Sequence, residues 1–138
     1  MTAVVLDTRA VEVLADRAVE PGAARHLRDL LAWAVRRDVP VRIPTAVLAE
    51  AYRGTGADVG VHRVLNSGVR AITVGRATAR VAGALRHRDG LDSCHTVDAL
   101  VVATAVRLGG GIIATGDPED IGGLARDHPN VAVDSLRH

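Results

Sequence analysis

The sequence predicts an α/β fold: a three-layer α/β/α sandwich whose central parallel sheet has four or five strands in the order 3-2-1-4-5. Short apolar runs rich in β-branched residues recur along the 138 residues, which is typical of strands buried on both faces. Segments with apolar residues at helical spacing separate several of these runs. This alternation indicates βαβ units, and the length suits a single domain over residues 1–138.

The first strand is predicted at residues 3–6, where "AVVL" is short, apolar and β-branched. Pro21 and Gly22 then open the segment "AARHLRDLLAWAVRRD" over 23–38, which we predict to be a helix. Its apolar residues recur at helical spacing at Leu27, Leu30, Leu31, Ala34 and Val35.

The next two elements are short. A second strand, "VRI", is predicted at 41–43 and ends at Pro44. Thr45 is expected to cap the short helix "AVLAEAYR" over 46–53, which Gly54 ends.

The second half of the chain repeats the pattern. A third strand, "RAITV", is predicted at 70–74 and is followed by an amphipathic helix over 76–88, closed by Gly90. Strands four and five are predicted at 111–115 and 131–133.

The stretch "VDALVVATAV" is open to two interpretations. Its β-branched content fits a strand, and Gly109-Gly110 would then form a hairpin turn. However, the segment 93–108 is long for a strand, and Gly109 suits the position just after a helix. A helix that is apolar all round is also typical of a buried crossover, so we predict a helix here.

Composition narrows the class of protein. The chain is 48% hydrophobic but has no Phe, and Trp33 and Tyr52 are its only large aromatic residues, so base stacking cannot dominate any RNA recognition. The net charge of +1 implies no long-range field towards nucleic acid. The single Cys94 excludes an internal disulfide. The first ten residues make a poor signal peptide and no uncharged apolar run approaches about 20 residues, so we expect a cytoplasmic protein without a membrane segment.

Four acidic residues stand near the predicted strand ends. Asp7 ends the first strand, Glu50 lies in the helix after the second, Asp98 begins the apolar helix, and Asp117 follows the fourth strand. Ligands of open parallel sheets gather outside the carboxyl ends of the strands, where the strand order reverses, so Asp7 and Asp117 should be neighbours with Asp98 nearby. Crowded carboxylates raise one another's pKa unless a cation such as Mg²⁺ or Mn²⁺ offsets the repulsion.

Each of these acids also has a purely structural interpretation. Asp7 suits a turn at a strand end, and Glu50 could pair with Arg53 at the surface. Asp98 would complement the dipole at a helix start, and Asp117 would cap a helix. Only their combined positions favour a metal site.

Three segments carry a resemblance to a known family. They are "VVLDTRAV", "IPTAVLAEAYRG" and "VDALVVATAVRLGGGIIATGDPEDIGGLA", and they span nearly the whole chain in this order. Together they resemble the PIN domain, and most closely the VapC-type toxins of bacterial VapBC toxin–antitoxin systems. The resemblance implies a Mg²⁺- or Mn²⁺-dependent endoribonuclease that leaves a 5′-phosphate and a 3′-hydroxyl. It also implies an RNA substrate, a VapB-type antitoxin as partner, and a homodimer.

The resemblance also implies roles for single residues. It places the four acids of the family at Asp7, Glu50, Asp98 and Asp117. The three aspartates would hold the metal, the glutamate would bind or orient a water, and Thr115 would be an auxiliary hydrogen-bond donor. One departure from the family pattern is Arg9, where a small residue is common; its guanidinium would either contact a phosphate or point outward.

Other functions with an acidic strand end fit less well. A haloacid-dehalogenase-type phosphatase needs a second Asp where Arg9 stands, and both it and a response-regulator receiver need a Lys, which the chain lacks. The "GK[ST]" of a P-loop is missing as well. A non-catalytic PIN-like module that binds RNA or protein remains the alternative, because four acids can bind a metal without turnover.

The remaining polar residues are expected to be structural. Cys94 is expected in the core or near the site, and the six histidines show no metal-ligand spacing, although His95 lies close to Asp98 in the sequence. Asp92 is expected to cap the following helix. The arginines of 76–88 are expected on a solvated face, with RNA or partner contact as the alternative.

Overall fold

The computed structural model describes residues 2–137 and has one five-stranded sheet, in which every pair of neighbouring strands is parallel. The strand order is β3-β2-β1-β4-β5, as predicted. The strands are β1 (Val4–Leu6), β2 (Val41–Pro44), β3 (Arg70–Ile72), β4 (Gly111–Thr115) and β5 (Val131–Ser135).

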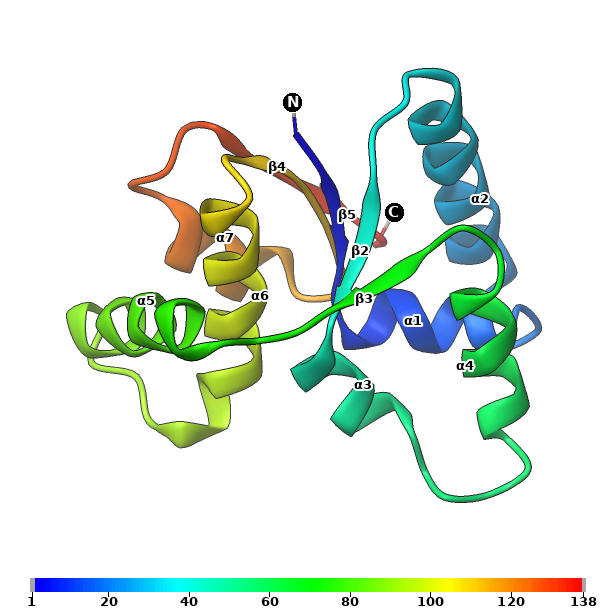
Figure 1. Cartoon of the computed structure of the whole chain (residues 1–138), viewed down its shortest axis with the longest axis horizontal. Coiled ribbons are helices and arrows are strands. Elements are labelled where there is room, and N and C mark those ends of the chain that lie inside the picture. Colours follow the sequence, from blue (N-terminus) through cyan, green and yellow to red (C-terminus); the bar gives the residue numbers. More distant parts are fainter. Residues whose placement is uncertain (1, 138) are drawn as a thin grey trace.

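Helices cover both faces of this sheet. They are α1 (Thr8–Ala15), α2 (Pro21–Arg36), α3 (Thr45–Ala51), α4 (Asp58–Leu65), α5 (Arg76–Arg88), α6 (Thr96–Arg107) and α7 (Pro118–Ala125). Figure 1 shows α1, α2 and α4 on one side of the sheet and α5, α6 and α7 on the other. Helix α3 follows β2 and contacts both α1 and α6. The three-layer α/β/α sandwich is therefore confirmed. None of the helices between residues 2 and 137 combines the length and the apolar character needed to cross a bilayer.

Some local expectations were wrong. Thr45 is the first residue of α3 and does not cap it; Pro44 holds the cap position as the last residue of β2. The Thr45 hydroxyl instead accepts a hydrogen bond from the backbone N–H of Val74, 3.1 Å away. Val35, expected on the apolar face of α2, is 79% exposed. The eight-residue helices α1 and α4 were not expected, and α7 was raised only as a helix that Asp117 would cap.

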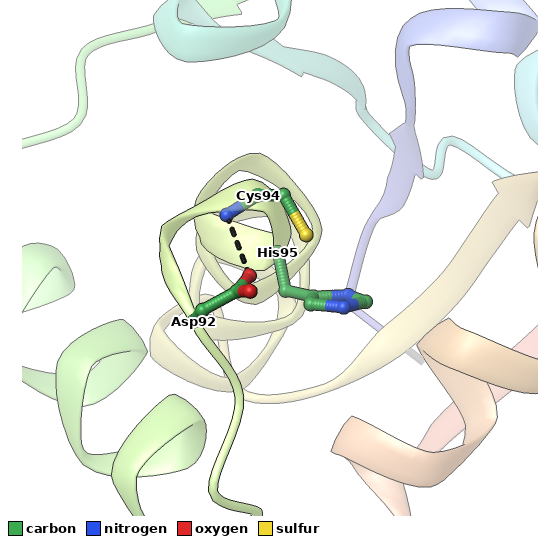
Figure 2. Close-up of side chains that lie close together, drawn as sticks. All are labelled: Asp92, Cys94 and His95. Carbon is green, nitrogen blue, oxygen red and sulfur yellow. Dashed lines mark hydrogen bonds between the residues drawn. The ribbon is translucent and has the colours of Figure 1, made fainter.

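The apolar stretch before β4 is a helix, as predicted. A 3₁₀ turn, η1 (Ser93–His95), precedes α6, so the predicted helix over 93–108 is divided in two. The carboxylate of Asp92 caps this turn by accepting a hydrogen bond from the backbone N–H of Cys94 at 3.0 Å (Figure 2). Helix α6 buries six of its residues and lies against β1, β2 and β4, which explains its lack of a polar face.

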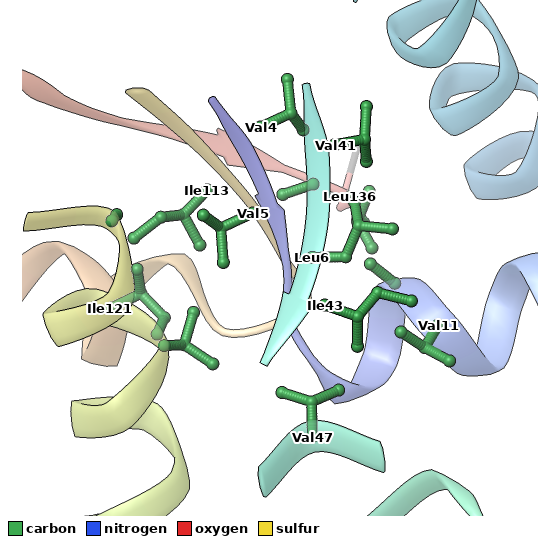
Figure 3. Close-up of a cluster of buried hydrophobic side chains, with 14 of the residues drawn as sticks. Val4, Val5, Leu6, Val11, Val41, Ile43, Val47, Ile113, Ile121 and Leu136 are labelled. Carbon is green, nitrogen blue, oxygen red and sulfur yellow. The ribbon is translucent and has the colours of Figure 1, made fainter. Parts of the chain in front are cut away.

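The core is aliphatic on both faces of the sheet. Figure 3 shows Val5 and Ile113 on the side of α6, whereas Leu6 and Ile43 lie on the side of α1. All four side chains are fully buried. The close pairing of β4 with β1 also requires a glycine at Gly111, because its φ is +149° and a Cβ there would collide with the backbone of Ala3, just before β1. This tight pairing aligns the carboxyl ends of the two strands.

Candidate metal centre

The carboxyl ends of β1 and β4 lie side by side where the strand order reverses. Leu6 pairs with Ala114 in the sheet, and the backbone N–H of Asp7 donates to the Ala114 carbonyl at 3.2 Å. The residues that follow, Asp7 after β1 and Asp117 after β4, therefore meet at the same edge. Open parallel sheets bind their ligands at such an edge.

Asp7 is a buried carboxylate held by backbone groups from both connections. Its Oδ1 accepts a hydrogen bond from the N–H of Ala10 at 2.9 Å and so caps α1, while its Oδ2 accepts one from the N–H of Gly116 at 3.1 Å. The side chain of Thr115 bonds to the same carboxylate. Burial raises the pKa of Asp7, as does the charge of Asp117, while these three hydrogen bonds oppose the rise.

Asp98 stands in the first turn of α6 and is half-buried. Its pKa is raised to about 6, first by burial and then by the negative charges of Asp117, Asp7 and Asp120, against a smaller opposite effect of His95. The carboxylates are thus close enough to repel one another. A bound cation would relieve this repulsion.

Asp117 is exposed and has a cationic neighbour. Its side chain does not cap α7, although the residue occupies the cap position. Its backbone N–H donates to the hydroxyl of Thr115 at 2.8 Å. The guanidinium of Arg137 donates to Asp117 at 3.3 Å and to the Gly116 carbonyl at 2.9 Å. The register of β5 on β4 brings Arg137 here, since Thr115 is paired with Ser135.

Glu50 reaches the same region from α3. It is exposed, and its Oε1 accepts a hydrogen bond of 2.6 Å from the hydroxyl of Thr8. The alternative pairing with Arg53 does not occur: Arg53 donates to Glu12 at 3.1 Å instead. One oxygen of Glu50, Oε2, is left for other partners in the described structure.

The four predicted acids line one open cavity of about 480 Å³. Further charged residues of this cavity were not predicted from the sequence: Glu12, Glu20 and Arg137. Arg9 also lines it, but its guanidinium is paired with Glu20 and lies 4.0 Å from Glu12. The cavity is therefore acidic, with two arginines at its border.

The donor set fits a hard divalent cation, because carboxylate oxygens dominate the cavity. However, the residues whose ligand atoms lie closest together are not the three predicted aspartates. Within residues 2–137, two sets of three ligand atoms lie within 4.8 Å of one another: Asp92, Cys94 and His95, and His95, Asp98 and Asp120. His95, the histidine singled out for its closeness to Asp98 in the sequence, belongs to both sets. Cys94 is exposed at the cavity rather than part of the core.

The fold has a counterpart among solved structures. A chain of the crystal structure of VapBC2 from Rickettsia felis bound to a DNA fragment from their promoter matches with a TM-score of 0.69. The match covers 97% of this chain and 98% of that chain, at 15% sequence identity. No protein-family model matches the sequence, and neither does any curated protein. At this identity the likeness concerns the fold, which is the PIN-like α/β fold that the sequence resemblance implies.

Proposed function

We propose that the protein is a Mg²⁺- or Mn²⁺-dependent endoribonuclease and the toxin of a type II toxin–antitoxin system. The single observation that carries the proposal is the cluster of Asp7, Glu50, Asp98 and Asp117 around one cavity at the switch point of a PIN-like sheet. These residues come from four separate parts of the chain. The raised pKa of Asp98 supports a cation site, because its causes include the charges of two other members of the cluster.

Asp7, Asp98 and Asp117 would hold the cation in this proposal. When bound, Mg²⁺ or Mn²⁺ supplies a water of lowered pKa and neutralises charge on the scissile phosphate. Asp7 enters the site already oriented, since backbone N–H groups hold both of its oxygens. Thr115 adds a further bond to that carboxylate. Such outer partners stabilise the position of a metal ligand.

Glu50 and the arginines would act on the water and the substrate. The free Oε2 of Glu50 accepts a hydrogen bond from the attacking water, while Thr8 holds Oε1. The water oxygen attacks phosphorus, the P–O3′ bond breaks, and the products are a 5′-phosphate and a 3′-hydroxyl. Arg9 and Arg137, at the border of the cavity, would bind RNA phosphates by exchanging their present carboxylate partners.

The partner proposal rests on the fold. The similar structure from Rickettsia felis is VapBC2 bound to a DNA fragment from their promoter. By analogy, we propose a VapB-type antitoxin for this chain and a homodimer of the chain itself. We further propose one domain over residues 1–138 and a cytoplasmic location.

An RNA-cleavage assay tests the enzymatic part. Labelled RNA should be cut in Mg²⁺ or Mn²⁺ but not in EDTA, and the products should carry a 5′-phosphate. Asp98→Asn should reduce the rate by at least about 100-fold, the upper range for the loss of a metal's outer partner. Asp29→Asn, at an exposed position of α2 outside the cavity, is the matched control and should cleave normally.

The alternative function gives a different result. A non-catalytic module would bind Mn²⁺ in calorimetry and bind RNA without cutting it under any of these conditions. The enzymatic proposal fails if purified, folded wild-type protein shows that behaviour.

A further inference from the structure

A turn at the border of the acidic cavity brings together three different kinds of metal ligand. Asp92, Cys94 and His95 supply a carboxylate oxygen, a thiol sulfur and an imidazole nitrogen from four consecutive positions. The proposed nuclease chemistry uses none of them. Cys94 nevertheless lines the same cavity as Asp98.

The geometry of this turn leaves the ligand atoms accessible and close. One atom from each residue lies within 4.8 Å of the other two. Asp92 and Cys94 are exposed and His95 is half-buried. Figure 2 shows the sulfur of Cys94 and the ring of His95 pointing to the same side of the turn. The backbone of the turn is held by the 3.0 Å bond from the N–H of Cys94 to Asp92.

The distances are compatible with closure around one ion. Tetrahedral zinc holds nitrogen and oxygen at about 2.0–2.1 Å and sulfur at about 2.3 Å, which sets neighbouring ligand atoms about 3.3–3.6 Å apart when one of them is sulfur. The present ligand atoms lie within 4.8 Å of one another, so binding of one ion would require them to approach by at most about 1.5 Å. The fourth position would be open to water.

The donor chemistry differs from that of the aspartate cluster. Thiolate and imidazole select zinc and related transition metals, whereas carboxylate oxygen alone suits Mg²⁺ or Mn²⁺. We propose that Asp92, Cys94 and His95 form a second metal site, for a zinc-type ion, beside the oxygen-donor site. Binding replaces the thiol hydrogen, which is released as a proton.

His95 links this zinc-type site to the acidic cluster. A ring nitrogen of His95 also lies within 4.8 Å of a carboxylate oxygen of Asp98 and of one of Asp120. An ion held by Asp92, Cys94 and His95 would therefore lie next to Asp98, a proposed Mg²⁺ ligand.

Cobalt absorption tests the site without any measurement of activity. Metal-free protein titrated with Co²⁺ under reducing conditions should develop a sulfur-to-cobalt charge-transfer band, saturating at one ion per chain. The band should disappear when Zn²⁺ is added. Cys94→Ser should abolish it, and His95→Ala should weaken Co²⁺ binding by at least about tenfold. His87→Ala, an exposed histidine on α5, is the control and should bind as wild type does.

Two further measurements distinguish this site from cobalt bound at the aspartate cluster or between two chains. The variant Asp7→Asn should keep the cobalt band, and excess Mg²⁺ should not remove it. The cobalt result is therefore independent of whether the aspartate cluster proves to be a nuclease site. Folding of each variant is checked by circular dichroism. No band in folded wild type, or Co²⁺ binding unchanged by His95→Ala, would overturn the proposal. So would saturation at one ion per two chains, which indicates an ion bridged between exposed thiols.

Discussion

Replacing Asp98 by asparagine should make the metal-free protein more stable above neutral pH. The carboxyl has its pKa raised from 3.8 to about 6 by burial and by Asp117, Asp7 and Asp120. Its charged form is therefore disfavoured in the folded state. Between these two pH values the folded chain binds a proton that the unfolded chain has lost, so wild-type stability falls as the pH rises through this window. Asparagine is neutral at every pH in this window, so the stability of the variant does not fall for this reason.

The size of the effect follows from the same pKa. The difference between 3.8 and about 6 corresponds to about 3 kcal/mol, at about 1.4 kcal/mol for each tenfold change in proton affinity. Because Asp98 is only half-buried, solvent screening reduces this to about 1–2 kcal/mol. Favourable interaction with the dipole of α6 offsets at most about 0.3–1 kcal/mol. A net gain of about 1 kcal/mol raises the melting temperature of a chain this size by about 3–5 °C.

Thermal melts in EDTA measure this directly. Asp98→Asn should melt above wild type at about pH 8, and the two should converge as the pH falls below about 4, where the Asp98 carboxyl becomes protonated in the unfolded as well as the folded state. Asp29→Asn is the control and should show no such convergence. A lower melting temperature for Asp98→Asn at about pH 8 would refute the reasoning and identify the carboxylate as a structural helix-start residue.

Three other outcomes are expected. Mn²⁺ at about one hundred times its dissociation constant should stabilise wild type by about 2.7 kcal/mol, and Asp7→Asn should show a smaller rise in melting temperature; equal rises would contradict the metal assignment. Thr115→Val should cost about 1–3 kcal/mol in urea unfolding, because the buried hydroxyl accepts from a backbone N–H, while Thr115→Ser keeps the hydroxyl and should cost less, about 1 kcal/mol for the lost buried methyl. Gly60→Ala should cost about 1–3 kcal/mol, because a Cβ there would collide with the Ala15 carbonyl where α4 packs on α1. Gly56→Ala, in open space, is its control; similar losses in both would show that packing is not the cause.

The long elements were predictable because one physical signal dominates each of them. Leu27 and Ala34 in α2 are buried as helical spacing predicts, and the β-branched runs of β1 and β4 are buried on both faces. The short helices α1 and α4 gave no such signal. Helix α1 begins with a cap from Asp7, which looks in the sequence like a strand-end residue only. Helix α4 depends on the close approach of Gly60 to Ala15, a tertiary contact.

Two of the four acids of the candidate site could be placed from strand pairing, whereas Glu50 and Asp98, in helices, were assigned mainly through the family resemblance. Asp7 and Asp117 follow neighbouring strands, so parallel pairing alone places them at one edge. Arg137 was missed because β5 was expected to end at residue 133, whereas pairing continues to Ser135. If β5 had been predicted to reach Ser135, its register on β4 would have placed Arg137 near Asp117. The position of Glu20 against Arg9 had no signal, since it depends on how the chain turns between α1 and α2.

The hydrogen bonds that hold both oxygens of Asp7 affect which inactivating mutations would leave a stable protein in the cell. One carboxylate closes the start of α1 and holds the connection after β4, so losing it damages folding together with any catalysis. If the chain is a toxin, cells that escape it through Asp7 would carry an unstable product that proteases clear. Cells that escape through Asp98 would instead keep a durable, inert copy that still occupies the antitoxin. A mutation at Asp7 would therefore leave an active toxin copy in the same cell unaffected. A mutation at Asp98 would leave an inactive toxin that binds the antitoxin and so frees any active toxin copy.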